Sequence, residues 1–261
     1  MKASIIFSTH NKNWCLPNTL AAIARQKTTF PLEVCIVDDF SKEDPEPIIK
    51  EFLPKAKYLR LNKHYNFIYA PNLCLDMISD DVDIILPMSS DIIMLRDDTV
   101  EQLCHRVGRK KVAFAELANL RVSENLHSNF DLYVQPLIND WENTVMTKSL
   151  YPLHVSRKIP TAWLFFLGAA LKEDLYSIGY RENSCDAVLW QQMAKQNFDA
   201  DILTSAPAVH QWHPRFDVSC GVEGTCPFYC SRTRANGRWT APTPRIKPFN
   251  VIKPMFGKKF K

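Results

Sequence analysis

The chain of 261 residues is 46% hydrophobic and 23% charged, carries a formal net charge of +4, and contains only 7 glycines. This length and apolar content accommodate one large domain with a sizeable core and argue against low-complexity sequence. No run of about 18 uncharged apolar residues occurs, so the sequence predicts no membrane-spanning helix.

Strands and helices are predicted to alternate through the first half of the chain. The first apolar run, Ala3–Ser8, is too short for a signal peptide and shows no cleavage site, so we expect a buried strand and a cytoplasmic protein. Helical spacing of apolar residues then continues to about Lys27. Further strands are predicted at 32–37, 58–61 and 83–88, and further helices at 43–52, 70–78 and 99–107.

Polar residues follow three of these predicted strands, at Ser8–Asn11, Asp38–Asp39 and Ser89–Asp91. Alternation of strands and helices predicts a mainly parallel sheet that is covered on both faces. Ligands bind such sheets where the carboxyl ends of the strands meet. None of these turns is a glycine-rich phosphate loop, which argues against a nicotinamide or P-loop enzyme.

The second half of the sequence is less regular. We expect a buried strand at 163–171 that turns at Gly168, helices at 172–178 and 186–196, and a strand at 206–209. No internal repeat is seen, and no linker occurs before residue 215. The sequence therefore predicts one domain over 1–215 and a cysteine-containing, proline-rich basic extension over 216–261.

Seven short motifs occur in the order typical of inverting family 2 glycosyltransferases, and the resemblance covers roughly residues 3–215. The family patterns Pro-Thr-Tyr-Asn, Val-Asp-Asp-Gly-Ser, Ala-x-Asn, Asp-x-Asp, Gly-Gly-Ala, Glu-Asp and a late His motif resemble, in turn, Phe7–Asn11, Val37–Ser41, Ala70–Asn72, Ser89–Asp91, Leu167–Ala170, Cys185–Asp186 and His210–His213. The resemblance implies the GT-A fold, a Rossmann-like α/β architecture with a mixed, mainly parallel sheet.

The resemblance also implies a nucleotide-sugar donor, with a UDP-sugar favoured. Asp39 would accept a hydrogen bond from the imide N–H of a uracil-like base, which suits a carboxylate. Thr9 would line the same pocket, and Asn72 would support the donor or the loop that carries it. The full set of implied donor-binding residues is Thr9, Asn11, Asp38, Asp39, Asn72 and Ser90.

Metal and catalytic roles are implied in the same way. Asp91 would bind Mn²⁺ or Mg²⁺ at the donor diphosphate, and His210 or His213 would be a further ligand, which favours Mn²⁺. Asp186 would remove the proton of the acceptor hydroxyl during an inverting transfer. The sequence departs from the family at Ser89 and Cys185, each of which replaces a carboxylate. The first departure implies weaker metal binding.

Each of these residues also has a purely structural interpretation. Asp38-Asp39 and Ser89–Asp91 are typical of turns and caps, and Asp186 suits the start of a helix. Two other functions stay open: a nucleotidyltransferase on a similar fold, and a non-catalytic nucleic-acid-binding protein that acts through the basic tail. The acceptor is equally open between DNA and a glycolipid or polysaccharide.

The eight cysteines fall into two groups. Five are scattered through predicted core segments, and we expect reduced, buried thiols there. The other group could supply a structural Zn²⁺ site, from any four of His210, His213, Cys220, Cys226 and Cys230. The spacing contains no paired Cys-x-x-Cys motif, so loose thiols are the default interpretation and a disulfide within 220–230 is an alternative.

The tail is strongly basic. Nine of the 32 Lys and Arg residues, and none of the 28 Asp and Glu residues, lie in 231–261 together with four prolines. We expect an extended segment that pairs with an anionic partner. Nucleic acid and an acidic membrane surface both fit, and the protein would then be peripheral to a membrane or associated with nucleic acid.

Overall fold

The computed structural model describes residues 1–65, 69–121, 166–182 and 186–212. These residues form an eight-stranded sheet in the order β3-β2-β1-β4-β7-β6-β8-β5. The strands are β1 (Ala3–Thr9), β2 (Leu32–Asp38), β3 (Lys57–Arg60), β4 (Ile84–Pro87), β5 (Ile92–Met94), β6 (Lys111–Arg121), β7 (Gly168–Leu171) and β8 (Asp199–Trp212). The helices are α1 (Leu16–Ala24), α2 (Glu46–Phe52), α3 (Ala70–Leu73), the short 3₁₀ turn η1 (Cys74–Asp76), α4 (Thr99–Arg106), α7 (Lys172–Ser177) and α8 (Asp186–Lys195).

Strand β1 lies inside the sheet and fixes its parallel half. It pairs in parallel with β2 on one side and with β4 on the other, and β2 pairs in parallel with β3. The β6–β8 pair is also parallel, whereas β7 runs antiparallel to β4 and β6, and β5 runs antiparallel to β8. The sheet is therefore mixed and mainly parallel, as predicted.

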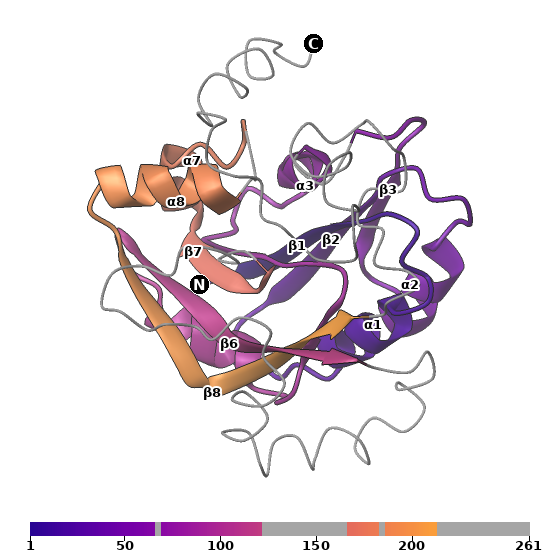
Figure 1. Ribbon diagram of the computed structural model, residues 1–261, viewed down its shortest axis with the longest axis horizontal. Coiled ribbons are helices and arrows are strands. Elements are labelled where there is room, and N and C mark those ends of the chain that lie inside the picture. The colour runs from indigo at the N-terminus through magenta and orange to yellow at the C-terminus, as the bar shows by residue number, and fades with distance from the viewer. Residues whose placement is uncertain (66–68, 122–165, 183–185, 213–261) are drawn as a thin grey trace, which may run out of the picture.

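Helices cover both faces of the sheet (Figure 1). Successive residues of β1 point to opposite faces, so Ile5 and Phe7 belong to one buried cluster and Ile6 to the other. The first cluster includes residues of α1, α2 and α4, and the second includes residues of α3, α7 and α8. Burial on both faces explains why the sequence of β1 is a continuous apolar run rather than an alternating one.

Several boundaries differ from those predicted. The predicted helix at 70–78 is divided into α3 and η1, and β8 begins at Asp199, well before the predicted strand at 206–209. Sequence analysis assigned no strand to β5 or β6. Residues Val112–Ala115 are buried, but their Ala-rich composition carries little strand signal, and the pairing with β7 and β8 determines the structure.

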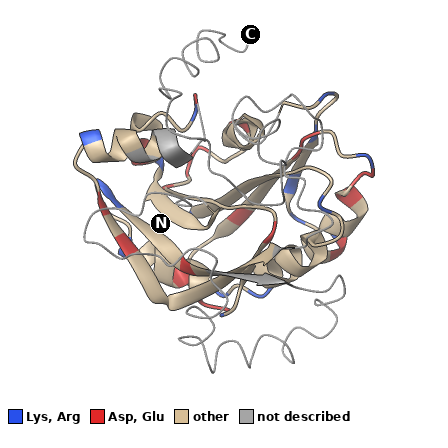
Figure 2. Cartoon of the chain, viewed as in Figure 1, with Lys and Arg blue, Asp and Glu red and all other residues tan. Residues whose placement is uncertain are grey.

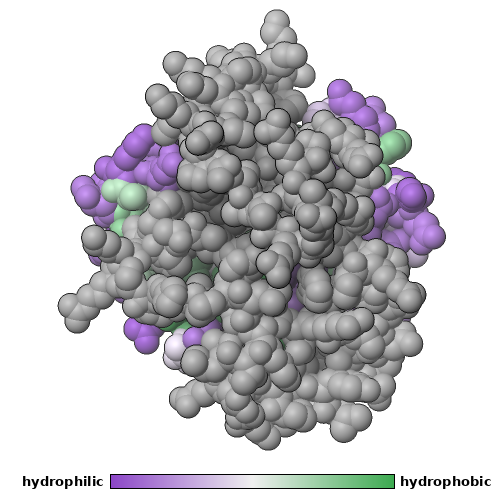
Figure 3. All heavy atoms as spheres, in the orientation of Figure 1, coloured by the Kyte–Doolittle hydropathy of each residue, from purple (hydrophilic) through white to green (hydrophobic). Residues whose placement is uncertain are grey.

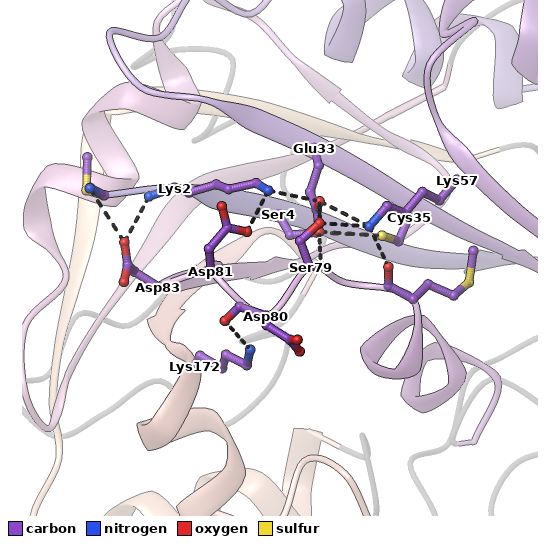
Figure 4. Close-up of polar contacts among 12 residues, drawn as sticks. Lys2, Ser4, Glu33, Cys35, Lys57, Ser79, Asp80, Asp81, Asp83 and Lys172 are labelled. Carbon is purple, nitrogen blue, oxygen red and sulfur yellow. Dashed lines mark hydrogen bonds and ion pairs between the residues drawn. The ribbon is translucent and has the colours of Figure 1, made fainter.

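Polar contacts connect the amino ends of β1, β2 and β3 (Figure 4). The Glu33 carboxylate accepts hydrogen bonds from the Ser79 backbone N–H at 2.9 Å and the Ser79 hydroxyl at 2.7 Å. It also forms ion pairs with Lys57 at 3.2 Å and Lys2 at 3.6 Å. Burial alone would raise the pKa of Glu33, but the Ser79 and Lys57 contacts outweigh it and lower that pKa. This network joins β1, β2 and β3 to the segment before β4.

Charged residues lie mainly on helices, loops and strand ends (Figure 2), and hydrophilic residues dominate the described surface that Figure 3 shows. Four of the scattered cysteines, Cys15, Cys35, Cys74 and Cys104, are free and buried, as expected for packed thiols. No helix within the described residues is long and apolar enough to cross a bilayer. The predicted division at residue 215 and the basic tail lie outside the described residues.

Candidate active site

The loop after β1 is tied to the loop after β2 at the carboxyl edge of the sheet. Asn11 adopts a positive φ of 52°, and its backbone N–H donates to the Ser41 hydroxyl at 2.9 Å. Its side-chain oxygen accepts from the Lys42 backbone N–H at 2.8 Å. The Asp39 backbone N–H donates to the Thr9 carbonyl at 2.8 Å. The predicted donor-binding residues Thr9, Asn11 and Asp39 therefore lie together.

Asp39 is almost fully buried, with 2% of its surface exposed. Its carboxylate accepts from the Tyr65 backbone N–H at 2.7 Å and lies 2.9 Å from the His64 Nδ1 atom. The Asp39 carbonyl lies 2.6 Å from His10 Nδ1 and 3.3 Å from His64 Nδ1. The two imidazole rings lie against each other, with centroids 4.3 Å apart. We call His10, Asp39 and His64 the Asp39 cluster.

Hydrogen bonds define the protonation of His10. Its Nδ1 must donate, because the Asp39 carbonyl can only accept, and its Nε2 lies 2.9 Å from the Asn11 amide nitrogen, which donates. The Asn11 oxygen is already committed to the Lys42 N–H, so the amide cannot reverse. The contacts therefore require a neutral imidazole. Burial lowers the pKa of His10, and His64 contributes further to the lowering.

Asp38 is completely buried and holds the turn after β2. Its carboxylate accepts from the Ser41 backbone N–H at 3.2 Å and from the Ser41 hydroxyl, and it lies 3.5 Å from Arg60. Burial raises the pKa of Asp38, and the Ser41 contacts offset only part of that effect. These contacts are those of a structural turn residue.

A second cluster surrounds Asp91, whose exposed fraction is 5%. One carboxylate oxygen lies 2.9 Å from the Lys12 ammonium and 3.4 Å from His210 Nε2. The other oxygen has no hydrogen-bond partner among the described residues. Burial alone would raise the pKa of Asp91, but the contacts with Lys12 and His210 outweigh it and hold that pKa far below its usual range. We call Asp91, Lys12 and His210 the Asp91 cluster.

Antiparallel pairing between β5 and β8 explains how His210 reaches Asp91. Ile92 is the register partner of His210, and the Gln211 backbone N–H donates to the Asp91 carbonyl at 2.8 Å. The Gln211 side chain is buried and bonds to Asn18 at 2.7 Å and to Thr19 at 3.0 Å on α1. The end of β8 is therefore locked against both β5 and α1.

The two clusters share one loop. His10 contacts Asp39 and Lys12 contacts Asp91, and these two residues of the loop after β1 are only two positions apart. Their Cα atoms are thus at most about 7 Å apart. The structure brings the strand-end carboxylates Asp39 and Asp91 to the same edge of the sheet.

The remaining predicted donor residues lie nearby in the fold. Ser90 is buried, and its carbonyl accepts from the Thr19 hydroxyl at 3.0 Å. Thr9 and Asn72 each carry one buried side-chain oxygen, Oγ1 and Oδ1 respectively, that finds no partner within the part of the chain that the structure describes. Such buried, unpartnered oxygens are typical of positions where a ligand or water supplies the missing bond.

Some predicted residues fall outside the described part. Asp186 begins α8, but its side chain is not described. His213, Cys185 and the cysteines at 220, 226 and 230 also lie outside it, so the proposed zinc cluster is not described either. The body of α8 is placed by Leu189 and Met193, which are buried against the sheet.

Sequence analysis did not identify Lys12 or His64 as site residues, and it named His10 only within a motif. The signal available was position: Lys12 lies in the polar turn after β1, and His64 follows β3. His10, Asp39 and His64 also bring one potential metal-ligand atom each to within 4.8 Å of one another. In this cluster, however, both Nδ1 atoms face the Asp39 carbonyl oxygen, which can only accept a hydrogen bond. In this arrangement the Nδ1 atoms act as hydrogen-bond donors rather than as metal ligands.

A mixed, mainly parallel sheet between two helical layers, with carboxylates at the ends of β2 and β4, defines a GT-A domain. Comparison with protein families agrees, because the model described as "Glycosyl transferase family 2" matches residues 4–165. The match spans more than half of the chain. The chain belongs to glycosyl transferase family 2.

Individual relatives match parts of the chain. Chondroitin synthase of Escherichia coli is 42% identical over 66 residues, which is 24% of this chain and 10% of the relative. Hyaluronan synthase of Pasteurella multocida is 44% identical over 59 residues, or 22% of this chain and 6% of the relative. The O-antigen chain rhamnosyltransferase RfbN of Salmonella typhimurium is 27% identical over 105 residues, or 40% of this chain and 33% of the relative.

Solved structures share the fold at low identity. S. aureus TarS 1-349 in complex with UDP aligns with a TM-score of 0.54 at 15% identity, covering 82% of this chain and 61% of that one. Mannosyltransferase PcManGT from Pyrobaculum calidifontis, in complex with GDP-Man and Mn²⁺, aligns with a TM-score of 0.55 at 15% identity, covering 82% and 58%. This chain therefore spans about three fifths of the structures and between 6% and 33% of the relatives cited above.

Proposed function

We propose that this chain transfers a sugar from a nucleoside diphosphate donor, preferably a UDP-sugar, to a hydroxyl of a saccharide acceptor, with inversion at the anomeric carbon. The observation that carries the proposal is the pair of clusters on one loop. A buried carboxylate with two imidazoles lies at the end of β2, and a buried carboxylate with one oxygen that has no partner among the described residues lies after β4. The names of the relatives support the saccharide acceptor, and the complex of the structural neighbour TarS with UDP supports the donor.

The Asp39 cluster is suited to the nucleoside. The Asp39 carboxylate already accepts from Tyr65 and His64, so it is fixed in orientation before a ligand arrives. A carboxylate offers about four acceptor positions, which leaves room for the imide N–H of a uracil-like base. The Thr9 hydroxyl, which has no partner within the part of the chain that the structure describes, adds a second polar contact at the same strand end.

The Asp91 cluster fits a divalent cation. A buried carboxylate oxygen without a partner among the described residues is an open ligand position, and His210 places an imidazole nitrogen 3.4 Å from the same carboxylate. Mixed oxygen and nitrogen ligands favour Mn²⁺ over Mg²⁺. When bound, such a cation neutralises the charge that develops on the departing diphosphate. Lys12 holds a positive charge at this position and can also face a phosphate.

Asp186 is the residue that we assign as general base. It is the first residue of α8, and this helix packs on the sheet through Leu189 and Met193. In an inverting transfer, a carboxylate takes the proton of the acceptor hydroxyl as the hydroxyl oxygen attacks the anomeric carbon from the side opposite the diphosphate. A bond forms between the acceptor oxygen and the anomeric carbon as the bond between that carbon and the phosphate oxygen breaks, and the nucleoside diphosphate leaves.

Calorimetric titration with UDP and UDP-sugars in the presence of Mn²⁺ tests the donor site. Asp39→Asn removes the charge at the Asp39 cluster and is expected to weaken UDP binding by about 10- to 100-fold, because one hydrogen bond to a charged group is lost. Asp201→Asn is the matched control, since Asp201 pairs with Lys111 at the surface of β6 and β8. Equal affinity of Asp39→Asn and wild type would refute the donor assignment.

Transfer is tested separately from binding. Asp186→Asn is expected to retain UDP-sugar binding and to lose at least about 100-fold in transfer rate, the usual contribution of a general base. Product analysis with saccharide, lipid-linked saccharide and DNA acceptors identifies the acceptor class. Nucleotidyl transfer from a nucleoside triphosphate, in place of sugar transfer, would refute the proposal.

A further inference from the structure

Phe40 has an unusual backbone conformation at the end of β2. Its φ is 63°, in the left-handed region, where bulky side chains are rarely found. Among the described residues, the other non-glycine residues with positive φ are Asn11, Lys110 and Asn197, and asparagine tolerates this region well. The family pattern that Val37–Ser41 resembles has glycine at this position. A phenylalanine here therefore destabilises the turn relative to glycine.

The Phe40 side chain gains little from burial. Its exposed fraction is 49%, whereas the neighbours Asp39 and Ser41 are at 2% and 3%. Within the described part of the chain, only Met1, Phe40 and Leu59 are exposed large hydrophobic residues. A single exposed apolar side chain is common on protein surfaces. Its combination with an unfavourable backbone conformation is what distinguishes Phe40.

Phe40 is attached directly to the Asp39 cluster. The peptide group between Asp39 and Phe40 supplies the carbonyl oxygen that lies 2.6 Å from His10 Nδ1 and 3.3 Å from His64 Nδ1. By standard peptide geometry, the Phe40 Cα is about 3 Å from that oxygen. The aromatic side chain thus starts next to the imidazole pair and next to Asp39, the carboxylate that we assign to nucleobase binding.

We infer that Phe40 is a nucleoside-contacting residue, whose ring packs against the base or ribose of the donor held at Asp39. The inference rests on the proposed function. An aromatic face suits this ligand because every nucleobase has a flat π-surface, and stacking on it tolerates different bases. Binding would bury apolar surface that the free protein exposes. The unfavourable φ is then a consequence of placing an aromatic ring where glycine would suit the backbone better.

Three substitutions separate the ring from the backbone. Phe40→Gly removes the ring and relieves the conformation, and it is expected to raise the Tm by about 2–4 °C and to weaken UDP binding roughly 10-fold. Asparagine also tolerates this φ, so Phe40→Asn removes the ring without strain and is expected to weaken UDP binding as much as Phe40→Gly does. Phe40→Tyr keeps an aromatic face and is expected to bind UDP as wild type does.

Lys110→Gly is the matched control, since Lys110 has a φ of 53° in the turn before β6. The backbone N–H that donates to Asp174 is retained in this variant. It should raise the Tm as Phe40→Gly does and leave the Kd for UDP unchanged.

Thermal melts without ligand and calorimetry with UDP and with uridine are the two readouts. Loss of affinity for both ligands in Phe40→Gly, with a raised Tm, supports nucleoside contact. Wild-type affinity in Phe40→Gly overturns the inference while leaving the proposed function intact. A lowered Tm together with weaker binding also overturns it, because the ring would then be packing within the fold. Failure of the wild type to bind UDP or any other nucleotide overturns the proposed function as well.

Discussion

Replacing Lys12 by methionine tests whether the Lys12 ammonium occupies the position at Asp91 where a metal ion would bind. The Lys12 and Asp91 side chains are 16% and 6% exposed, so the pair that they form at 2.9 Å is largely buried. Removing one partner of a buried ion pair costs about 3–5 kcal/mol, because the other charge is left uncompensated. His210 remains 3.4 Å from Asp91, so we expect the lower value, about 3 kcal/mol.

In the absence of divalent cations, this loss corresponds to a fall in Tm of roughly 6–12 °C for Lys12→Met. Mn²⁺ at about 100 times its Kd would restore about 2.7 kcal/mol by binding the folded state alone. The same concentration should stabilise the wild type less, because the Lys12 ammonium competes with the metal for the Asp91 carboxylate. Differential scanning fluorimetry with and without Mn²⁺ measures both effects.

Lys27→Met is the control, since Lys27 pairs with Asp97 at 2.6 Å but the two side chains are 81% and 47% exposed. An exposed pair contributes little to stability, so this variant should melt as wild type does and respond to Mn²⁺ as wild type does. The reasoning is refuted if Lys12→Met is as stable as wild type, or if it is destabilised and Mn²⁺ adds no more stability to it than to the wild type.

Two further predictions follow from the pKa shifts. Because burial lowers the pKa of His10, the folded state should lose stability as pH falls below about 6.5, where the unfolded chain binds the proton first. His10→Asn keeps a donor for the Asp39 carbonyl without a titrating ring, so its fall in Tm between pH 7 and pH 5.5 should be smaller; an identical fall would contradict this. The pKa of Glu33 is lowered because contacts in the folded state favour its charged form. Its contribution to the stability of the fold is therefore present above the ordinary pKa of 4.5 and is lost as pH falls through the folded value. Glu33→Gln should cost about 1–2 kcal/mol in urea unfolding at pH 7 with unchanged UDP affinity, and a loss that does not shrink between pH 7 and pH 3 would contradict the assignment.

The parallel half of the sheet could be predicted from the sequence because its strands are continuous apolar runs that end in polar residues. Once β1, β2 and β4 are parallel neighbours, Thr9, Asp39 and the segment that leads to Asp91 must lie at one edge. The antiparallel half could not be predicted in the same way. Strand β6 is rich in alanine, and its pairing with β7 and β8 is a long-range outcome that local periodicity does not encode.

Side-chain partners were harder to predict than backbone positions. The motif order placed His210 with Asp91, but nothing in local sequence indicates that Lys12 extends to the same carboxylate. The lysine side chain is long and flexible, so its partner is decided by the folded loop rather than by its neighbours in sequence. The same holds for His64, which reaches Asp39 only because β3 pairs with β2.

Under the proposed function, the charge balance around Asp91 would determine when a cation binds there. The family pattern offers two carboxylates, but this chain has Ser89 in place of the first and places the Lys12 ammonium on the second. A divalent ion arriving alone meets one carboxylate that is already neutralised. A nucleoside diphosphate brings the missing negative charge, and its phosphates can pair with Lys12 while the cation takes the open Asp91 oxygen. Cation and donor should therefore bind together far more tightly than the cation alone, and Lys12→Met should reduce that difference.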